Sequence, residues 1–222
     1  MNSGNANQAA IRLLLWSIAA LVGFFVAAWI GHRVGGLILS FFKVFIALWA
    51  VFLIAVLYLF RDPDPIQPSD LSAIVSPAHG KVDVIEETVE SEFMKGACKR
   101  VSITVSLWNV QVQYAPVAGT VAHYAYHPAK IEGGTLRAEN LLMGFDAVGR
   151  PDIRLAVRLT AGTWGRRIVP WVKAHDVIGR SDRIGMMRPA SKVDLYLPGA
   201  VKLHVNPGDE VVGGQSVVAK YE

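Results

Sequence analysis

Few side chains in this sequence have the type and spacing that chemistry requires, and two histidines are the first to test. His123 and His127 lie four residues apart in a segment that alternates like a β-strand. At about 3.3 Å per residue they would stand roughly 13 Å apart on one face, too far to bind one metal ion together. We interpret both as solvated or core histidines and predict no metal site.

The remaining candidates for chemistry are a lone cysteine and a pair of arginines. Cys98 is the only cysteine, which excludes an intrachain disulfide and is most simply explained as a small apolar residue near the start of a strand. Arg166 and Arg167 stand side by side before an apolar segment, where one could bind a lipid phosphate through its planar fork. An ordinary salt bridge explains that pair equally well.

The charge distribution points to a membrane surface and not to nucleic acid. The chain carries 22 basic and 18 acidic side chains, with a mean hydropathy of +0.35. Residues 1–60 hold three of the basic residues and no acidic one, which leaves the rest nearly balanced at 19 against 18. No basic block marks the later residues as a DNA- or RNA-binding face, so we predict no nucleic-acid partner.

Two apolar runs, residues 13–30 and 37–60, predict a membrane anchor over residues 1–60. Each approaches the length that crosses a bilayer core of about 30 Å, and Lys43 lies near enough to one end to reach the headgroups. A cleaved signal peptide and a buried helical hairpin are the alternatives. Arg12 and Arg61 flank the side that both ends of the hairpin share. We therefore expect the inner (cytoplasmic) membrane, with the following domain in the cytoplasm.

The rest of the chain is predicted to be a proline-rich linker and a β-domain. Residues 61–70 contain three prolines, which disfavour helix in the residues before them. From residue 71 to 222 the apolar period is mostly two, as in "KRVSITVSL", with Gly and Pro between the segments. We predict a mainly-β fold, a sandwich or barrel-like domain behind an N-terminal helical hairpin.

Five segments in order give this chain a family resemblance. It resembles the short, membrane-anchored phosphatidylserine decarboxylases, including the archaetidylserine type. The family has Ser-Pro-Ala-Asp-Gly where the second of these segments stands. The segments are "FRDP" at 60–63, "SPAHGKV" at 76–82, "VQVQYAPVAGTV" at 110–121, "GRRIVPWV" at 165–172 and "RIGMMRPASKVDLYLP" at 183–198.

The resemblance implies a cofactor made from the chain itself. In that family the serine at the position of Ser191 attacks the carbonyl of the preceding residue, here Ala190. The chain then splits, and the new N-terminus carries a pyruvoyl group that serves as an electron sink for decarboxylation. The implied substrate is a serine-headed phospholipid in a membrane. Arg166, Arg167 and Arg188 would be its phosphate contacts.

The sequence departs from the family where acid–base chemistry is expected. His79 replaces the Asp of the family motif, Gln111 its His, Asn109 a frequent Asp two residues earlier, and Ala190 the usual Gly. Gln and Asn cannot take up a proton near pH 7. Standard activity is therefore doubtful, and Ser191 could be an ordinary strand-start serine.

Two accounts remain open. In one the chain is an unprocessed relative that binds a serine phospholipid, forms a homo-oligomer or pairs with an active decarboxylase homologue. In the other it is an active decarboxylase that converts phosphatidylserine to phosphatidylethanolamine, and His79 serves as the base because imidazole titrates near neutrality. A purely structural membrane protein would show no headgroup preference.

Overall fold

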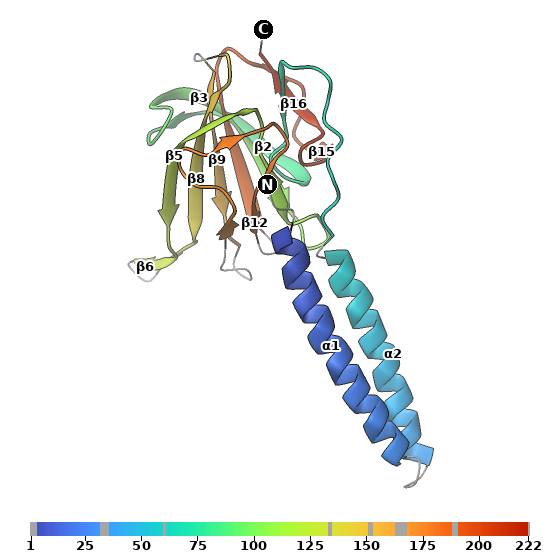
Figure 1. Ribbon diagram of the computed structural model, residues 1–222. Coiled ribbons are helices and arrows are strands. Elements are labelled where there is room, and N and C mark those ends of the chain that lie inside the picture. Colours follow the sequence, from blue (N-terminus) through green and yellow to red (C-terminus); the bar gives the residue numbers. More distant parts are fainter. Residues whose placement is uncertain are drawn as a thin grey trace. The chain divides into compact units, whose positions relative to one another are not determined.

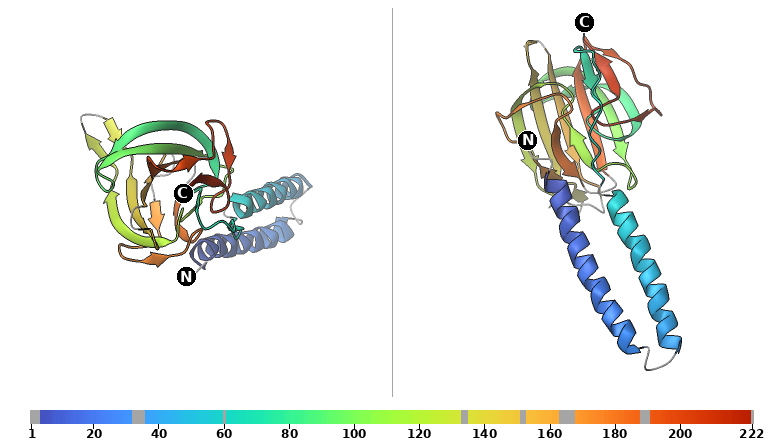
Figure 2. Two further views of the ribbon diagram at one scale, coloured as in Figure 1. Left: turned by 90° about the horizontal axis from the view of Figure 1, so that it is seen from above. Right: turned by 45° about the vertical axis from the view of Figure 1, so that its right-hand side comes forward.

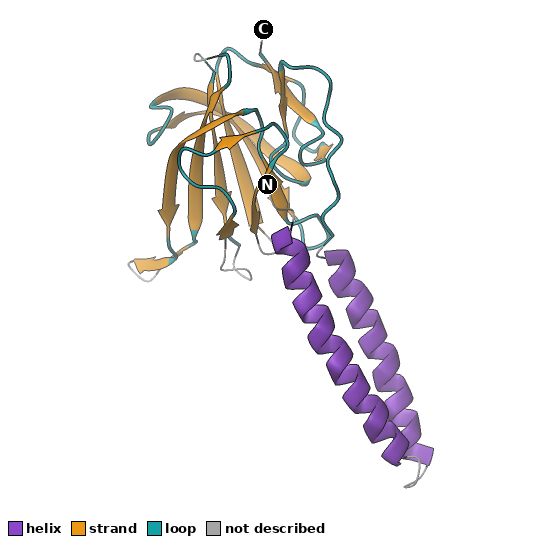
Figure 3. Ribbon diagram, in the orientation of Figure 1, coloured by secondary structure: helices purple, strands orange, loops and turns teal. Residues whose placement is uncertain are grey.

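The structure separates helices from strands along the chain. This computed structural model describes residues 4–31, 36–59, 61–132, 135–150, 153–162, 168–187 and 191–221. The chain forms two compact units, Met1–Asp62 and Pro63–Glu222. Both described helices belong to the first unit and all described strands to the second (Figures 1 and 3). The predicted mainly-β fold behind an N-terminal helical hairpin is confirmed.

The first unit is a pair of helices, α1 (Gly4–Gly31) and α2 (Gly36–Leu59). Aromatic contacts join them: the rings of Phe24 and Phe45 stack with centroids 4.1 Å apart. Trp49 Nε1 also donates to the carbonyl oxygen of Ser17 at 3.3 Å. Within α2 the 20 residues Ser40–Leu59 are long and apolar enough to cross a membrane, whereas the apolar stretch of α1, Leu14–Ile30, is shorter.

The second unit contains the strands of the chain. Their sequences are rich in β-branched residues that alternate between two faces, as strand packing favours. In chain order they are β1 (Ala73–Val75), β2 (Gly80–Glu90), β3 (Gly96–Val105), β4 (Val112–Tyr114), β5 (Gly119–His127), β6 (Lys130–Glu132), β7 (Thr135–Arg137), β8 (Asn140–Ala147), β9 (Arg154–Thr160), β10 (Ile168–Pro170), β11 (Val177–Ile178), β12 (Arg183–Met187), β13 (Ser191–Pro198), β14 (Lys202–Leu203), β15 (Glu210–Val211) and β16 (Val217–Lys220).

One large antiparallel sheet organises the domain. Its strand order is β11-β5-β8-β9-β13-β3-β2-β15, and it curls strongly when seen along its strands (Figure 2). Two three-stranded sheets, β1-β16-β14 and β10-β12-β4, complete the domain with the β6-β7 hairpin. Strand β13 lies between β9 and β3, so the strand that begins at Ser191 is central.

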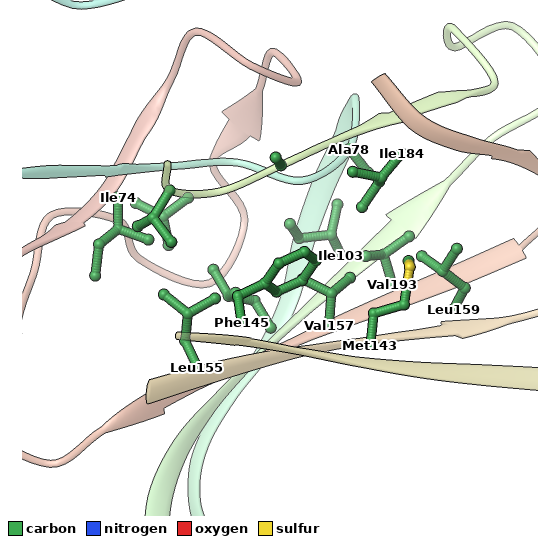
Figure 4. Packing of buried hydrophobic residues seen from close by; sticks show 14 of the residues in the cluster. Ile74, Ala78, Ile103, Met143, Phe145, Leu155, Val157, Leu159, Ile184 and Val193 are labelled. Atoms are coloured by element: carbon green, nitrogen blue, oxygen red, sulfur yellow. The ribbon is translucent and has the colours of Figure 1, made fainter. Parts of the chain in front are cut away.

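The main core lies on the concave side of the large sheet. Side chains from β3, β8, β9 and β13, among them Ile103, Phe145, Val157 and Val193, point toward one another and toward Ala78 and Ile184 (Figure 4). A smaller cluster of Phe93, Cys98, Leu142, Ala156 and Tyr196 covers the opposite face. Neighbouring residues of a strand thus belong to different clusters, because successive side chains of a strand point to opposite faces of the sheet.

Candidate functional site

The turn before β2 is built to present His79. The Ser76 hydroxyl donates to the carbonyl oxygen of Ala78 at 2.7 Å, which closes the turn. The backbone of Ser76 is held on both sides, by Ser216 O and by Gly214 N, each at 2.8 Å. A Cβ on Gly80 would lie 2.3 Å from the carbonyl oxygen of Thr104, so only glycine fits there. The Ser-Pro-Ala-x-Gly pattern therefore has a structural cause that is independent of the residue at position 79.

Two neighbours fix the ring of His79. The Tyr114 ring lies with its centroid 5.7 Å from that of the imidazole. A Cβ on Gly213 would stand 2.8 Å from His79 Nδ1 and 2.8 Å from Tyr114 Cδ2, so the glycine backbone fills the remaining space. The side chain is partly exposed, while its Nδ1 atom is buried. His79 is thus a held side chain at an accessible surface.

His79 opens onto a cleft of about 860 Å³. Charged side chains of both signs lie around it: Lys81, Asp83 and Glu210. Lys192 Nζ lies 3.3 Å from Asp83 Oδ2 at one side. The lining residues are His79, Gly80, Lys81, Val82, Asp83, Thr104, Ser106, Asn109, Pro207, Gly208, Glu210, Val211 and Val212. Mixed charges of this kind suit a ligand that carries both an amine and acidic groups.

Two lining residues of the cleft, Ser106 and Asn109, belong to a turn that we call the cleft turn, residues 106–111. The Asn109 side-chain oxygen accepts from both the backbone N–H and the hydroxyl of Ser106. Gln111 Nε2 donates to the carbonyl oxygens of Ser106 at 2.9 Å and Asn109 at 2.7 Å. Both amides therefore stabilise the turn itself.

Ser191 lies close to this turn along the sheet. It is the first residue of β13, is only 4% exposed, and pairs with Val105 of β3. The next position of β13 belongs to a row of paired residues across β2, β3 and β13, which contains Lys81, Thr104 and Lys192. Two strand spacings, roughly 10 Å, thus separate the backbone at Ser191 from that at Gly80. The cleft has His79 and Asn109 in its lining, and does not include Ser191 or Gln111 among the described lining residues.

The structure does not describe every predicted site residue. Arg166, Arg167, Arg188 and Ala190 fall outside the described residues. In the part of the chain that the structure describes, no group of three or more His, Cys, Asp and Glu side chains could hold a metal ion.

The two histidines of β5 lie beside the small cluster on the convex face, away from the cleft. His127 Nε2 lies 3.3 Å from Glu92 Oε2, and the His123 ring stacks on Phe93 with centroids 5.7 Å apart. Cys98 is buried in the same cluster.

Sequence reasoning missed three contributors: Tyr114, Gly213 and Lys81. Tyr114 and Lys81 stand within the quoted motifs, but nothing in a strand pattern says which side chain will meet His79. Gly213 begins a Gly-Gly pair, a signal for close backbone approach that does not name the residue approached.

Comparisons with known proteins point to one family. The phosphatidylserine decarboxylase family matches residues 52–219. A phosphatidylserine decarboxylase proenzyme of Desulfotalea psychrophila is 38% identical over 178 residues, covering 77% of this chain and 82% of the relative. One from Symbiobacterium thermophilum is 32% identical and covers 91% of both. No solved structure matches. Because the family match covers most of its length and these relatives are more than 30% identical to it, the chain belongs to the phosphatidylserine decarboxylase family.

Proposed function

We propose that this protein binds serine-headed phospholipid in the cleft and remains a single, unprocessed chain. The observation that carries the proposal is Gln111, whose amide nitrogen donates to two carbonyl oxygens of the cleft turn. At the position of Gln111 the family has a histidine, which can take up and release a proton. The amide of Gln111 cannot do so.

The pyruvoyl group that the family implies has its precursor here but lacks the usual acid–base partners. Ser191 stands at the position of the family's serine and is the first residue of β13, which also fits an ordinary strand-start serine. Asn109 and Gln111 bond to the cleft turn and offer no group that titrates near pH 7. The described residues therefore do not fit formation of the group by the family's ordinary route. Loss of one member of a catalytic set commonly lowers rates about a thousandfold or more.

The cleft itself supports headgroup binding. A phosphoserine headgroup carries one ammonium, one carboxylate and one phosphate. Lys81 offers a cation to the acidic groups, and Asp83 and Glu210 offer carboxylates to the ammonium. The proposed membrane attachment rests on Ser40–Leu59, and a bilayer would supply the lipid.

We propose the cytoplasmic side for the β-domain, from Arg12 and Arg61 flanking the same side of the hairpin. Protease cleavage of the β-domain in inside-out vesicles, with protection in intact cells, is the expected result. The opposite pattern would contradict the orientation. A homo-oligomer or a pairing with an active decarboxylase homologue fits the same role, and size measurement in nanodiscs with and without that homologue tests it.

A second candidate function is decarboxylation with His79 as the base for Ser191. It is favoured by the one imidazole in the described lining of the cleft, which Tyr114 and Gly213 hold in place. In this account His79 takes the proton of the Ser191 hydroxyl, and the chain splits after Ala190.

Intact mass separates the two candidates. We expect the purified protein to have the mass of one uncleaved chain. The Ser191→Ala variant should likewise show a single uncleaved chain. Fragments 1–190 and 191–222, with a ketone-reactive end on the second, would contradict the proposal. A block of that cleavage by His79→Ala would then establish the second candidate.

A restored variant provides the positive control. The changes His79→Asp, Asn109→Asp, Gln111→His and Ala190→Gly return the family's residues. We expect this variant to be cleaved, and the same variant with Ser191→Ala to stay whole.

Lipid binding is tested on the full chain with nanodiscs that contain phosphatidylserine or phosphatidylcholine. We expect preference for the serine lipid, weakened about fivefold by Lys81→Ala. Lys202→Ala is the matched control, because Lys202 is an exposed lysine of the same domain that is not among the cleft-lining residues. No headgroup preference would indicate a purely structural membrane role.

A further inference from the structure

The proline-rich segment 63–70, which we call the strap, packs along the β-domain. Arg180 donates from its guanidinium to the carbonyl oxygens of Pro68, Asp70 and Ala73. The Asp70 carboxylate pairs with Lys220 at 2.7 Å and accepts two hydrogen bonds from Ser72. Hydrogen bonds from Lys220 and Ser72 hold the pKa of Asp70 well below its usual range. The strap therefore has a fixed course at its C-terminal end.

The N-terminal end of the strap reaches the residues that hold His79. The Tyr114 hydroxyl donates to the carbonyl oxygen of Pro63 at 3.4 Å. Arg183 Nη2 lies 2.7 Å from Asp64 Oδ1. Pro65 packs so closely on Gly214 that a Cβ there would stand 2.8 Å from the proline Cβ. Each contact falls on, or directly beside, a residue of the His79 environment.

The contacts continue without a break to the imidazole. The Tyr114 ring faces the His79 ring, and Gly213 fills the space between them. Gly214 is fixed by its own bonds: its N–H donates to Ser76 O at 2.8 Å, and its carbonyl accepts from the Ser181 hydroxyl at 2.6 Å. A shift of the strap at Pro63–Pro65 would thus act on Tyr114 and on the 213–214 turn together.

We infer that the strap is a positioning element of the site, acting on His79 through Tyr114 and Gly213–Gly214. A passive linker would not contact these residues at three successive positions. The segment follows the helical anchor directly in the chain, since the first unit ends at Asp62. The effect on lipid binding rests on the proposed function, whereas the effect on His79 does not.

The test uses the full chain in nanodiscs and reads the ring signal of His79 by NMR, assigned by its loss in His79→Gln. Two variants release the strap independently: Asp64→Arg opposes Arg183, and Pro65→Gly removes the ring from Gly214. The matched control is Glu86→Arg, since Glu86 forms an ion pair with Arg100 at 2.6 Å on strands β2 and β3. The backbone amide chemical shifts of Gln67 and Ser69, which lie at least two residues from either substitution, report whether the strap has moved.

We expect Asp64→Arg and Pro65→Gly each to shift the amide signals of Gln67 and Ser69, to shift or broaden the His79 signal, and to weaken phosphatidylserine binding about twofold to fivefold. Glu86→Arg should change none of these. Adding Arg183→Asp to Asp64→Arg should recover the His79 signal, which a general loss of structure would not allow.

Two results would overturn the inference. In one, the amide signals of Gln67 and Ser69 show that the strap has moved while the His79 signal stays unchanged. In the other, neither variant alters those amide signals, so that the named contacts do not hold the strap. If the His79 signal responds but binding shows no preference for the serine lipid, the positioning role stands and the proposed function fails.

Discussion

Two loops of the β-domain bury polar side chains and treat them differently. The tip of the β2–β3 hairpin, residues 90–94, buries Glu90, which is 2% exposed. Its carboxylate accepts from the backbone N–H groups of Glu92, Phe93 and Met94 at 2.7–2.9 Å, and Arg158 lies 3.7 Å away. The cleft turn buries Gln111, which is 5% exposed and uses only its nitrogen.

The difference shows in the acceptor atoms. Burial alone would raise the pKa of Glu90, but the three N–H groups and Arg158 outweigh it and lower that pKa. The Oε1 atoms of Gln111 and of neighbouring Gln113 are buried with no hydrogen-bond partner among the described residues. An unmet buried acceptor costs about 1–3 kcal/mol. The hairpin tip is therefore built for stability, and the cleft turn carries a cost that is typical of functional sites.

The largest expected effect is on the hairpin tip, at Phe93. Its ring lies 2.5 Å from where a Cβ on Gly144 would be and beneath the Arg154 guanidinium at 4.2 Å. Phe93→Ala should lower the free energy of unfolding by about 3–5 kcal/mol. Denaturant unfolding of the full chain measures it, and Leu107→Ala, in the exposed part of the cleft turn, should change it by less than about 0.5 kcal/mol. Equal losses would remove the distinction between the loops.

Glu90→Gln should have the next largest effect. The amide retains the shape but loses the charge that strengthens three hydrogen bonds, so we expect a loss of about 1.5–3 kcal/mol. Thermal unfolding compares it with Glu87→Gln, a control at an exposed position of the same strand. A loss no greater than that of the control would mean that the tip does not depend on the carboxylate.

The same carboxylate predicts a dependence on pH. Because the folded-state pKa of Glu90 is lowered from 4.5, its stabilisation is fully present above that value and is lost as pH falls through the lower folded-state value. Between neutral pH and pH 3 the wild type should lose more stability than Glu90→Gln. Parallel curves for the two proteins would contradict this assignment.

The smallest effect is expected at Gln113. Its nitrogen donates to Gln111 O at 2.8 Å, while its oxygen has no partner among the described residues. Gln113→Met keeps the volume and removes the unmet acceptor, so stability should change by less than about 1.5 kcal/mol. A loss above about 3 kcal/mol would show that the hydrogen bonding of Gln113, next to the cleft turn, is as fully satisfied as that of Glu90 at the hairpin tip.

Much of the fold could be predicted from the sequence. The apolar runs indicated helices, and α2 spans nearly all of the predicted 37–60. The period of two indicated strands, because successive side chains must face opposite sides of a sheet. The ordered motifs indicated the family, which the match over residues 52–219 confirms. The predicted domain boundaries, the site roles of Ser191 and His79 and the phosphate contacts stay predictions.

Tertiary structure alone decided which residues meet. Tyr114 and Gly213 contact His79 although they lie 35 and 134 residues after it in the sequence. Pro65 contacts Gly214, which lies 149 residues after it. Segments 61–70 and 106–111 show no periodic pattern. The distant side chain of Arg180 holds the first, and hydrogen bonds from the Asn109 and Gln111 side chains hold the second. Local residue types determine whether a segment becomes helix or strand. The packing of a curled sheet determines which loops close around one cleft, and that depends on all its strands at once.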